Sequence, residues 1–589
     1  MASNQARIGV YVCHCGINIS HTVDVETVAQ YANELPNVVV ARDYTYMCSD
    51  PGQGLIKQDI EELDLTAVVV AACSPLMHEP TFRNVAETSG VNPYRVEIAN
   101  IREQCSWVHQ DRDAATAKAM QLIASAVAKA GRLEELYERE SDVVPAALVV
   151  GAGVAGMQAA LDIADAGFQV YLVEQADEIG GRAVQLSRTF PTLESVHELL
   201  TPYMARVHEH PLIQVLTRSQ VTEVGGYYGN FDVSVATQGG GNSSFKVGSV
   251  VVATGYDLFD AGRKPEFGYG TYPQVLTSLE YEQMLSPDGS TGGEILVDGK
   301  KPRNVVFIQC VGSRDKQVGN PHCSRICCMY TAKQASLTVE KLPNANVSVF
   351  YMDVRTFGKG FEEFYDQVRE QGVFYRRGNP SEIIHDPQGD GLIVRAEDTL
   401  LHRPIEVPAD LVVLAVGIEP RESTGRVANL LRLPNSADGF LTEAHPKLRP
   451  VDTVVGGVFL AGCCQGPKDI PDSITQARAA ASAALIPLMR GRVSIEAATA
   501  YIDPEVCAGC GICAEHCTYG ALTMHPFKGV MTVKAVLCQG CGACAAACPS
   551  GAINLHHFTA EQVLSQVDAL LGPFPEKLPE VQDAPVTGD

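Results

Sequence analysis

Residues 148–175 read LVVGAGVAGMQAALDIADAGFQVYLVEQ and decide the fold at the centre of the chain. An apolar strand runs into Gly151, Gly153 and Gly156, a helical stretch follows, and Glu174 ends the next strand eighteen residues after the last glycine. Glycines at this spacing allow a tight turn and let a pyrophosphate approach the helix N-terminus, while the carboxylate can accept hydrogen bonds from ribose hydroxyls. The stretch therefore predicts a dinucleotide site formed by Gly151, Gly153, Ala155, Gly156 and Glu174.

Three further motifs favour FAD over a nicotinamide dinucleotide. GlyGly follows the acidic residue in EQADEIGGRA (174–183), a later apolar strand ends in ATG (253–255), and LAGCCQGPKDIPDS (460–473) places a turn before a helix. We expect this helix to start after Pro471, with Asp472 or Ser473 as its N-cap. Its N–H groups from Ser473 to Thr475 would then face the flavin N1/O2 edge, although a tight turn before an ordinary helix is the alternative. The predicted flavin contacts outside the first loop are Gly181, Arg182, Ala253, Thr254, Gly255, Gly462, Asp469, Ser473 and Ile474.

Composition excludes several classes of protein. The 589 residues carry 45 Lys and Arg against 69 Asp and Glu, a net charge of −24, with 46% hydrophobic and 19% charged residues. Such a chain is typical of a compact multidomain protein, and we expect no nucleic acid partner. No apolar run reaches the roughly 18 residues of a membrane helix and no signal segment opens the chain, so we expect a cytoplasmic protein without a membrane span. Nineteen cysteines, many in CxxC or CC groups, indicate metal thiolate sites rather than disulfides.

The second nucleotide-type domain lacks its glycine loop. Around residue 308, where a disulfide-reductase-like flavoprotein would carry a second fingerprint, the sequence keeps a strand and a helix but has no GxGxxG. Within nineteen residues it has four cysteines instead: Cys310, Cys323, Cys327 and Cys328. Thiolates suit an iron–sulfur cluster or zinc, while a redox dithiol or buried small apolar side chains are the alternatives. Direct reduction by a nicotinamide is therefore not expected.

An internal repeat near the C-terminus predicts two further clusters. CAGCGICAEHC (507–517) recurs as CQGCGACAAACP (538–549), and both have the C-x₂-C-x₂-C-x₃-C spacing of two-cluster ferredoxins. In that arrangement the fourth cysteine of each run binds the other cluster. The predicted ligands are therefore Cys507, Cys510, Cys513 and Cys548 for one [4Fe–4S] cluster and Cys538, Cys541, Cys544 and Cys517 for the other. Thr518 replaces the usual proline after the fourth cysteine, which affects a turn rather than a ligand.

Cysteines also follow each predicted strand of the N-terminal segment. Because the carboxyl ends of parallel strands share one edge of a sheet, these thiols can meet in a crevice there. We predict a fourth cluster, with cysteines that serve only as buried apolar residues as the alternative. The expected ligands are Cys13, Cys48, Cys73 and Cys105, with Cys15 as the alternative to Cys13.

These patterns together predict a multidomain α/β protein. Its predicted parts are an N-terminal α/β domain with a cluster (1–142), the first part of an FAD domain (143–300), a degenerate NAD(P)-type domain with the central cysteines (301–410), the second part of the FAD domain (411–495), a two-cluster ferredoxin domain (496–556), and a helix with a tail (557–589).

The motifs together resemble the A subunit of heterodisulfide reductase, known from methanogens and many anaerobic bacteria. The resemblance covers nearly the whole chain, including YVCHCGINI, YMCSDPGQ, ACSPLMHEPTF, NIREQCSWVH, CVGSRD with HCSRICCMYTAKQ, FGKGFEEFY and GPKDIPD. It implies an oxidoreductase with FAD and [4Fe–4S] clusters, a thioredoxin-reductase-like fold, and a central cluster at the four clustered cysteines. It also implies twofold self-association in a complex with B and C type subunits, a delta-type subunit of a hydrogenase or formate dehydrogenase, and ferredoxin, with electron bifurcation at the flavin.

One departure from the family concerns the route to ferredoxin. Methanogen members carry an inserted two-cluster ferredoxin domain, whereas residues 183–300 of this chain contain no cysteine. Electron transfer is therefore a safer expectation than bifurcation. The alternatives are a subunit of a sulfur-metabolism or quinone-interacting complex, or an adaptor that wires partners without turnover. As candidate catalytic side chains near the flavin ring we name Lys359, Lys468 and Asp469, with solvated turn charges as the alternative.

Overall fold

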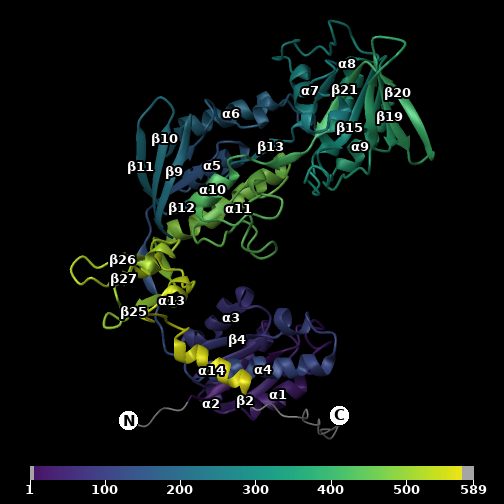
Figure 1. Ribbon diagram of the computed structural model, residues 1–589. Helices are drawn as coiled ribbons and strands as arrows, with labels where there is room; N and C mark the ends of the chain where they lie inside the picture. The colour runs from purple at the N-terminus through teal and green to yellow at the C-terminus, as the bar shows by residue number, and fades with distance from the viewer. Residues whose placement is uncertain (1–5, 573–589) are drawn as a thin grey trace. The chain divides into compact units, whose positions relative to one another are not determined.

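The computed structural model describes residues 6–572, which divide into two compact units (Figure 1). One unit holds the chain up to Glu140 together with the chain from Ser494 onward, and the other is Ser141–Val493. The short strands β5 (Arg139–Asp142) and β24 (Arg492–Ile495) lie where the chain passes between them. No helix among the described residues has the length and apolar character to cross a membrane.

A parallel four-stranded sheet of order β2-β1-β3-β4 forms the N-terminal domain. Its elements are β1 (Ile8–Cys13), α1 (Val25–Asn33), β2 (Val38–Tyr44), α2 (Asp50–Leu63), β3 (Ala67–Ala72), α3 (Pro75–Thr88), β4 (Val96–Asn100) and α4 (Arg112–Ala130). Successive side chains of a strand point to opposite faces. Ile8, Val10 and Val12 accordingly pack with α1 and α4, while Tyr11 and Cys13 pack with α2 and α3. Both faces are covered, as a parallel sheet requires.

The same unit contains the cysteine repeat, folded as two short hairpin-like pairs with two small helices. β25 (Ala500–Ile502) pairs with β28 (Ile553–Leu555), and β26 (Leu522–Met524) pairs with β27 (Met531–Val533), both antiparallel. The helices are α12 (Ile512–Glu515) and α13 (Ala543–Ala547), and α14 (Ala560–Leu571) follows. The tail predicted at the end of 557–589 lies mostly outside the described residues.

A buried charged network ties the start of α14 to the N-terminal domain. Lys129 Nζ lies 2.8 Å from Glu97 Oε2 and 3.9 Å from the centre of the Phe558 ring. His557 Nε2 lies 3.6 Å from the same carboxylate oxygen. Burial, and then the charges of Lys129 and Arg83, lower the pKa of His557 to about 3. The imidazole is therefore neutral in the folded protein at neutral pH.

The flavin-type domain is a parallel sheet of order β23-β12-β6-β7-β8 beside an antiparallel sheet of order β11-β10-β9. Its elements are β6 (Ala146–Val150), α5 (Val154–Asp165), β7 (Gln169–Val173), α6 (Val196–Glu209), β8 (Ile213–Leu216), β9 (Ser219–Tyr227), β10 (Asn230–Thr237), β11 (Asn242–Val247), β12 (Ser249–Val252), α10 (Thr424–Leu431), β23 (Val458–Leu460) and α11 (Ile470–Arg490). α5 and α11 share one apolar cluster against this sheet. The domain is thus completed by segments on both sides of an intervening one.

The intervening central domain starts earlier and ends later than the predicted 301–410. Its parallel sheet has the order β14-β21-β15-β16-β17, so the chain from β14 (Val275–Thr277) to β21 (Leu411–Val416) belongs to it. The other elements are β13 (Tyr256–Leu258), α7 (Ser278–Leu285), β15 (Asn304–Val311), α8 (Cys327–Lys341), β16 (Asn346–Tyr351), α9 (Phe361–Glu370), β17 (Phe374–Arg377), β18 (Pro380–His385), β19 (Leu392–Asp398), β20 (Arg403–Ala409) and β22 (Ile418–Pro420). The strand before α7 has only three residues, too few to show a pattern in the sequence.

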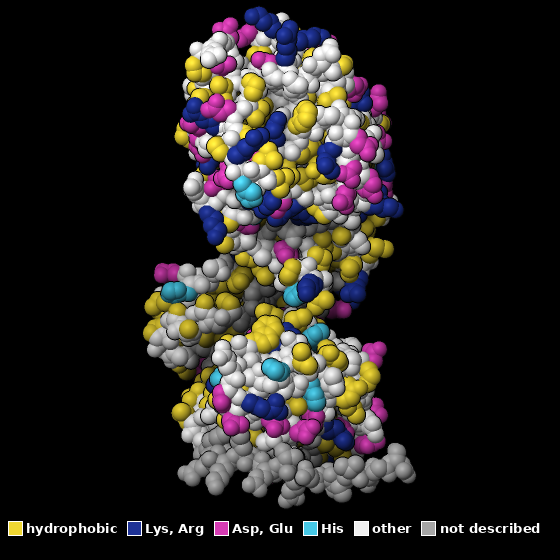
Figure 2. All heavy atoms as spheres, turned by 90° about the vertical axis from the view of Figure 1, so that its right-hand side faces the viewer, with side chains coloured by type: hydrophobic (Ala, Val, Ile, Leu, Met, Phe, Trp, Pro, Cys, Tyr) yellow, Lys and Arg dark blue, Asp and Glu magenta, His cyan; other side chains and the backbone are white. Residues whose placement is uncertain are grey.

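Charges are mixed on the surface of this domain. Figure 2 shows acidic and basic side chains interspersed over the central domain on one face of the molecule rather than gathered into a basic field.

Acidification should loosen α14 through His557. The pKa of His557 is about 3 in the folded protein, against an ordinary value of 6.5 for the unfolded chain. The contribution of His557 to the free energy of unfolding is therefore complete above pH 6.5. It is lost as the pH falls below 6.5, because the unfolded chain then binds a proton that the folded protein does not. Between pH 6.5 and about pH 5 the loss is about 2 kcal/mol. Hydrogen exchange of the α14 amides, corrected for intrinsic rates, should show this loss in the native chain and a smaller one in His557→Gln. Equal pH slopes in the two proteins would contradict the assignment.

Candidate flavin site and cysteine groups

The turn between β6 and α5 has the shape that a pyrophosphate needs. Gly151 has φ +100°, and a Cβ there would lie 2.4 Å from the Ala253 carbonyl oxygen. A Cβ on Gly156 would lie 1.7 Å from the Gly151 oxygen, so both positions require glycine. Gly153 is the N-cap of α5, has no side chain to satisfy the first N–H groups, and leaves open space in front of them. These free donors at a helix N-terminus suit an anion.

A pocket lies beside this turn, and its polar groups fit the adenosine end of a dinucleotide. Glu174 is buried, and its carboxylate accepts backbone N–H groups from Ala152 at 2.7 Å and Ala176 at 2.9 Å. These bonds fix the carboxylate and leave lone pairs for ribose hydroxyls. The Thr254 hydroxyl is buried without a partner in the structure, which is unusual unless a ligand supplies one. The pocket is lined by residues that include Glu174, Gln175, Ser219, Gln220, Thr254, Arg421, Ser423 and Arg426.

The second glycine pair packs against the first loop. Gly181 has φ +60°, and a Cβ there would lie 2.9 Å from the Gly153 Cα. Arg182 forms an ion pair with Asp257 at 3.3 Å. Gly255 has φ +77°, which also favours glycine, and the space around it is open. The structure therefore brings the EIGGRA and ATG motifs beside the turn before α5.

The start of α11 corrects one expectation. The helix begins at Ile470, and its N-cap is Asp469, whose carboxylate accepts the N–H of Asp472 at 2.8 Å; Asp472 and Ser473 are not caps. Pro471 lies inside the first turn, where its missing N–H costs nothing. The Ser473 N–H donates to the Asp469 carbonyl at 3.0 Å, so it does not point at a ligand as predicted. The helix N-terminus still lies beside Gly462, where a Cβ would lie 2.9 Å from the Ala155 Cβ.

The candidate catalytic side chains differ in their surroundings. Lys468 Nζ donates to the Gln465 side chain at 3.0 Å and the Gly462 carbonyl at 3.3 Å, and burial lowers its pKa. Burial raises the pKa of Asp469. Lys359 is exposed in the loop before α9, which fits the alternative that it is a solvated turn charge. Ile474 is half-buried on α11.

Arg325 joins three of the motifs that the sequence singled out. Its guanidinium donates to Asp472 at 2.9 Å and lies 4.6 Å from the Phe357 ring, while its backbone N–H donates to the Cys323 sulfur at 3.3 Å. The CSRICC turn, the FGKG loop and the start of α11 thus meet at one side chain.

The central cysteines gather where β15 ends and α8 begins. Cys310 is the penultimate residue of β15 with φ +62°, and Cys327 and Cys328 are the first two residues of α8. The Cys327 thiol hydrogen-bonds with the Cys310 and Cys328 side chains. These bonds lower the pKa of Cys328 to about 7 and raise the pKa of Cys327. Cys323 is half-buried, and the Arg314 guanidinium interacts electrostatically with it and with Cys310. The four thiols therefore share one region.

Seven of the eight repeat cysteines lie beside other members of their predicted groups. One pocket is lined by Cys517, Cys538, Cys541 and Cys544 together, the set expected for the second ferredoxin cluster. The electrostatic neighbours of Cys513 include Cys510 and Cys548, from the other set. Backbone N–H groups donate to the sulfurs of Cys507, Cys517 and Cys538 at 3.3–3.4 Å. Such donors are a feature of iron–sulfur sites.

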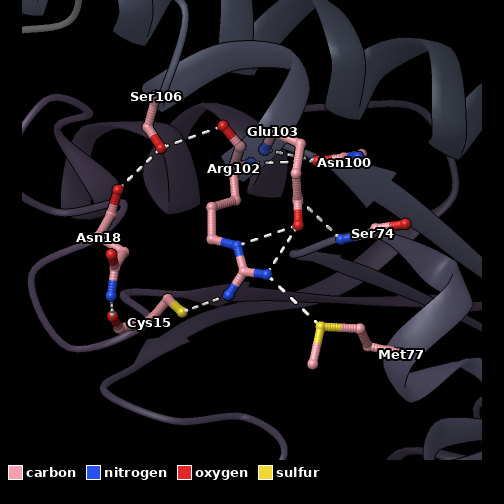
Figure 3. A network of polar contacts seen from close by, with 8 residues as sticks. All are labelled: Cys15, Asn18, Ser74, Met77, Asn100, Arg102, Glu103 and Ser106. Atoms are coloured by element: carbon pink, nitrogen blue, oxygen red, sulfur yellow. Dashed lines mark hydrogen bonds and ion pairs between the residues drawn. The ribbon is translucent and has the colours of Figure 1, made fainter. Parts of the chain in front are cut away.

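The N-terminal domain brings four of its five cysteines together at the carboxyl edge of the sheet. Cys13, Cys15, Cys48 and Cys73 act on one another electrostatically, and the Cys13 sulfur accepts N–H groups from Cys15 at 3.3 Å and Met47 at 3.5 Å. Cys105 does not join them, contrary to the prediction. Its thiol donates to the Ala115 carbonyl at 3.1 Å in the apolar core under α4. A π-helical turn after β4 directs it there and sends Arg102 into the crevice instead (Figure 3).

Within residues 6–572, no three His, Cys, Asp or Glu side chains converge on a single metal-ion position. In a [4Fe–4S] cluster each thiolate binds its own iron, so the ligands surround the cluster and need not converge on one point. The donor sets described above, all sulfur with N–H groups directed at several of the sulfurs, fit such clusters better than they fit zinc.

Sequence analysis missed one polar side chain at these sites, Arg102, and one buried ion pair elsewhere in the central domain, Lys333 with Glu282. Arg102 lies in NIREQCSWVH. The only signal in the sequence that could have indicated its role is its position just after the end of a strand. Lys333 and Glu282 form a buried ion pair at 2.7 Å on α8 and α7, and Gln334 also donates to this carboxylate. Charged residues this deeply buried are rare and often functional.

Replacing Gly156 with alanine should abolish FAD binding. The new methyl group would need the space of the Gly151 carbonyl, so the turn must open and the α5 N–H groups must move. Flavin content per chain, measured by absorbance after purification, should fall at least tenfold. Gly54→Ala in α2 is the matched control, because nothing lies within 4 Å of a Cβ there. Full flavin content in Gly156→Ala would contradict the site.

Comparison with known proteins agrees with this geometry. The family model "Pyridine nucleotide-disulphide oxidoreductase" matches residues 145–286, and "4Fe-4S dicluster domain" matches residues 491–555. Among solved structures, thioredoxin reductase of T. acidophilum is 17% identical with a TM-score of 0.40, covering 58% of this chain and 98% of its own. The predicted multidomain α/β fold, with a domain of the pyridine nucleotide-disulphide oxidoreductase type and a later two-cluster 4Fe-4S domain, is confirmed.

Relatives that match most of the chain are more similar in sequence. One of them, the second iron-sulfur A subunit of the CoB–CoM heterodisulfide reductase of Methanopyrus kandleri, is 47% identical over 89% of this chain and 92% of its own. The A subunit of the H(2):CoB-CoM heterodisulfide,ferredoxin reductase of Methanothermobacter thermautotrophicus is 45% identical over 96% of this chain and 98% of its own. The A subunit of the H(2)/formate:CoB-CoM heterodisulfide,ferredoxin reductase of Methanococcus maripaludis is 42% identical over 88% and 91%. The chain therefore belongs to the family of heterodisulfide reductase A subunits and is an oxidoreductase.

Proposed function

We propose that this chain is the FAD and iron–sulfur electron-transfer subunit of a heterodisulfide reductase complex. One observation carries the proposal: the flavin-type domain keeps an open turn for a pyrophosphate, whereas the central domain has cysteines and a closed turn at the equivalent place. A protein built this way takes its electrons from clusters and not from a nicotinamide.

The closed turn is visible at Gly312. A Cβ on Gly312 would lie 2.1 Å from the ring of Phe259, so an aromatic side chain fills the space in front of the turn after β15. At Gly153, the nearest atom to a Cβ is the Gly181 Cα at 3.9 Å. A phosphate can therefore approach α5 but not the end of β15, where Cys310 and Cys327 stand instead.

The proposed flavin site uses the chain's own groups in three ways. The α5 N-terminus holds the pyrophosphate, the buried Glu174 accepts from ribose hydroxyls, and the buried Thr254 hydroxyl gains its missing partner. Lys468 and Asp469 stand at the α11 N-terminus, where Lys468 is half-buried and Asp469 is buried. Bound FAD supplies the exchange between electron pairs and single electrons that clusters, as one-electron carriers, cannot make.

The four proposed clusters give the chain its connections to partners. We assign one to Cys310, Cys323, Cys327 and Cys328, two to the ferredoxin repeat, and one to Cys13, Cys15, Cys48 and Cys73. A hydrogenase or formate dehydrogenase partner would deliver electrons to the ferredoxin repeat, and B and C type subunits would take them to a heterodisulfide. The names of the Methanothermobacter and Methanococcus relatives support these partners.

Electron bifurcation needs a second exit, to ferredoxin. Since residues 183–300 contain no cysteine, we assign this exit to the N-terminal group. Exposed apolar side chains, which often mark contact sites between proteins, surround it. They are Ile17, Tyr46, Trp107 and Val108, which follow β1, β2 and β4, and Leu76 in the first turn of α3, which follows β3.

Iron content tests the central assignment. Four [4Fe–4S] clusters give about 16 Fe per chain, and Cys310→Ser should reduce this by about 4. Cys464→Ser is the control, because the Cys464 thiol is buried and donates to the Val252 carbonyl. NADPH alone should leave the flavin of the native protein oxidised, while a partner hydrogenase with H₂ should reduce it. Rapid reduction by NADPH, or unchanged iron in Cys310→Ser, would overturn the proposal.

The N-terminal ligand set has its own test. Cys73→Ser should lose about 4 Fe per chain, whereas Cys105→Ser should lose none, since its thiol faces α4. Iron analysis of both variants, with flavin content as a check on folding, distinguishes this set from the one that the sequence suggested. Loss of iron in both Cys73→Ser and Cys105→Ser would restore the original set, because that set contains both cysteines.

A further inference from the structure

The positively charged side chain of Arg102 lies in the crevice formed by the N-terminal cysteines (Figure 3). Arg102 Nη1 donates to the Cys15 sulfur at 3.3 Å, and Nη2 lies 3.6 Å from the Met77 sulfur. The guanidinium also lies 4.8 Å from the Trp107 ring, and its side chain is only 14% exposed. A guanidinium held this way is poorly screened by water, so its charge acts strongly on neighbouring groups.

The turn that carries Arg102 is fixed before any ligand binds. Asn100 Oδ1 accepts the backbone N–H groups of Arg102 at 3.3 Å and Glu103 at 3.0 Å. The Ser106 hydroxyl donates to the Asn18 carbonyl at 2.8 Å, which ties this turn to the loop after Cys15. The donor therefore has a set position relative to the Cys15 sulfur.

Glu103 makes the arrangement a dipole. Its Oε1 accepts from Arg102 Nη2 at 2.7 Å, and its Oε2 accepts the Ser74 N–H at 2.9 Å, next to Cys73. The pair is neutral as a whole, but its cationic end touches one cysteine loop and its anionic end touches another. The two ends must act on a charge in the crevice with opposite signs.

The sulfurs differ in what they accept. Cys13 receives two backbone N–H groups, and the ferredoxin and Cys323 sulfurs described above also receive backbone donors. Cys15 receives a charged side chain. Hydrogen bonds to the sulfurs and nearby charge set the reduction potential of a cluster, because reduction adds one electron and one negative charge to it.

We propose that Arg102 and Glu103 set the reduction potential of the centre at Cys13, Cys15, Cys48 and Cys73, with Arg102 raising it and Glu103 lowering it. The inference rests on the cluster assigned there under the proposed function. Both residues are positioning residues: they act on the centre through the sulfur and through their charge.

The test is a potentiometric titration of the full-length protein, with its clusters and FAD, followed by electron paramagnetic resonance. Dithionite supplies the electrons, and the N-terminal signal is identified as the one missing from Cys73→Ser. Arg102→Gln should shift its midpoint to more negative potential, changing its equilibrium with a reference dye about tenfold, which is 59 mV for one electron. Arg102→Lys, which keeps the charge, should shift it less.

Glu103→Gln should shift the midpoint in the opposite direction. Its amide oxygen can still accept the Ser74 N–H, so the fold is retained while the negative charge is lost. A purely structural role would make both substitutions disturb the centre alike, and only the charge argument predicts opposite signs. Arg112→Gln is the control, because Arg112 is exposed and pairs with Asp24 at 3.8 Å outside the crevice.

The outcomes are separable. Shifts of the same sign, or no shift, in a signal that is present overturn the inference and leave the cluster assignment intact. If Cys73→Ser loses neither iron nor signal, the cluster assignment fails and the inference with it, while the central and ferredoxin assignments stand. Should Arg102→Gln fail to assemble, Glu103→Gln still decides the sign, because it alone then removes a charge from the crevice.

Discussion

The function of this chain depends on one geometric constraint: strands of a parallel sheet all end at the same edge. Each of its three parallel sheets presents its loops there. In the flavin-type domain those loops carry glycine, in the central domain cysteine, and in the N-terminal domain cysteine with one arginine. Under the proposed function, the same fold element therefore serves a nucleotide in one place and iron–sulfur chemistry in two others.

Backbone N–H groups are the shared resource at these edges. At α5 they are free at a glycine N-cap and suit phosphate oxygens. At Cys13 and Cys323 they already point at sulfur. The exchange between the two uses needs only a few substitutions, since the strand and helix on either side stay in place. In the central domain, the Phe259 ring fills the space in front of the turn that a phosphate would take.

Sequence patterns predicted the residue groups that depend on fixed spacing in the chain. They failed for residues whose position depends on the geometry of a single turn. The glycine loop and the grouping of the ferredoxin cysteines follow from fixed intervals, and the structure places these residues together. Cys73 directly follows β3, whereas Cys105 lies in a π-helical turn after β4 that directs it into the core, and no residue pattern reports such a turn. Asp469 and Asp472 are equally good N-caps by residue type, so only backbone geometry separates them. The partnership of Arg102 with Cys15 joins residues 87 apart in sequence and could not be read from either motif.

The hydrogen-bond donors to the sulfurs differ in whether a substitution can remove them. A backbone N–H is present whatever the side chain, so hydrogen bonds of that kind in the ferredoxin repeat persist through substitution as long as the turn persists. A guanidinium and a carboxylate can each be replaced without moving the strand end that carries them, because Asn100 and Ser106 hold that turn independently. Charge in the N-terminal crevice can therefore be changed at little cost to the fold. A centre that exchanges electrons with a separate protein benefits from this freedom, since its potential must match that of a partner rather than a neighbour in the same chain.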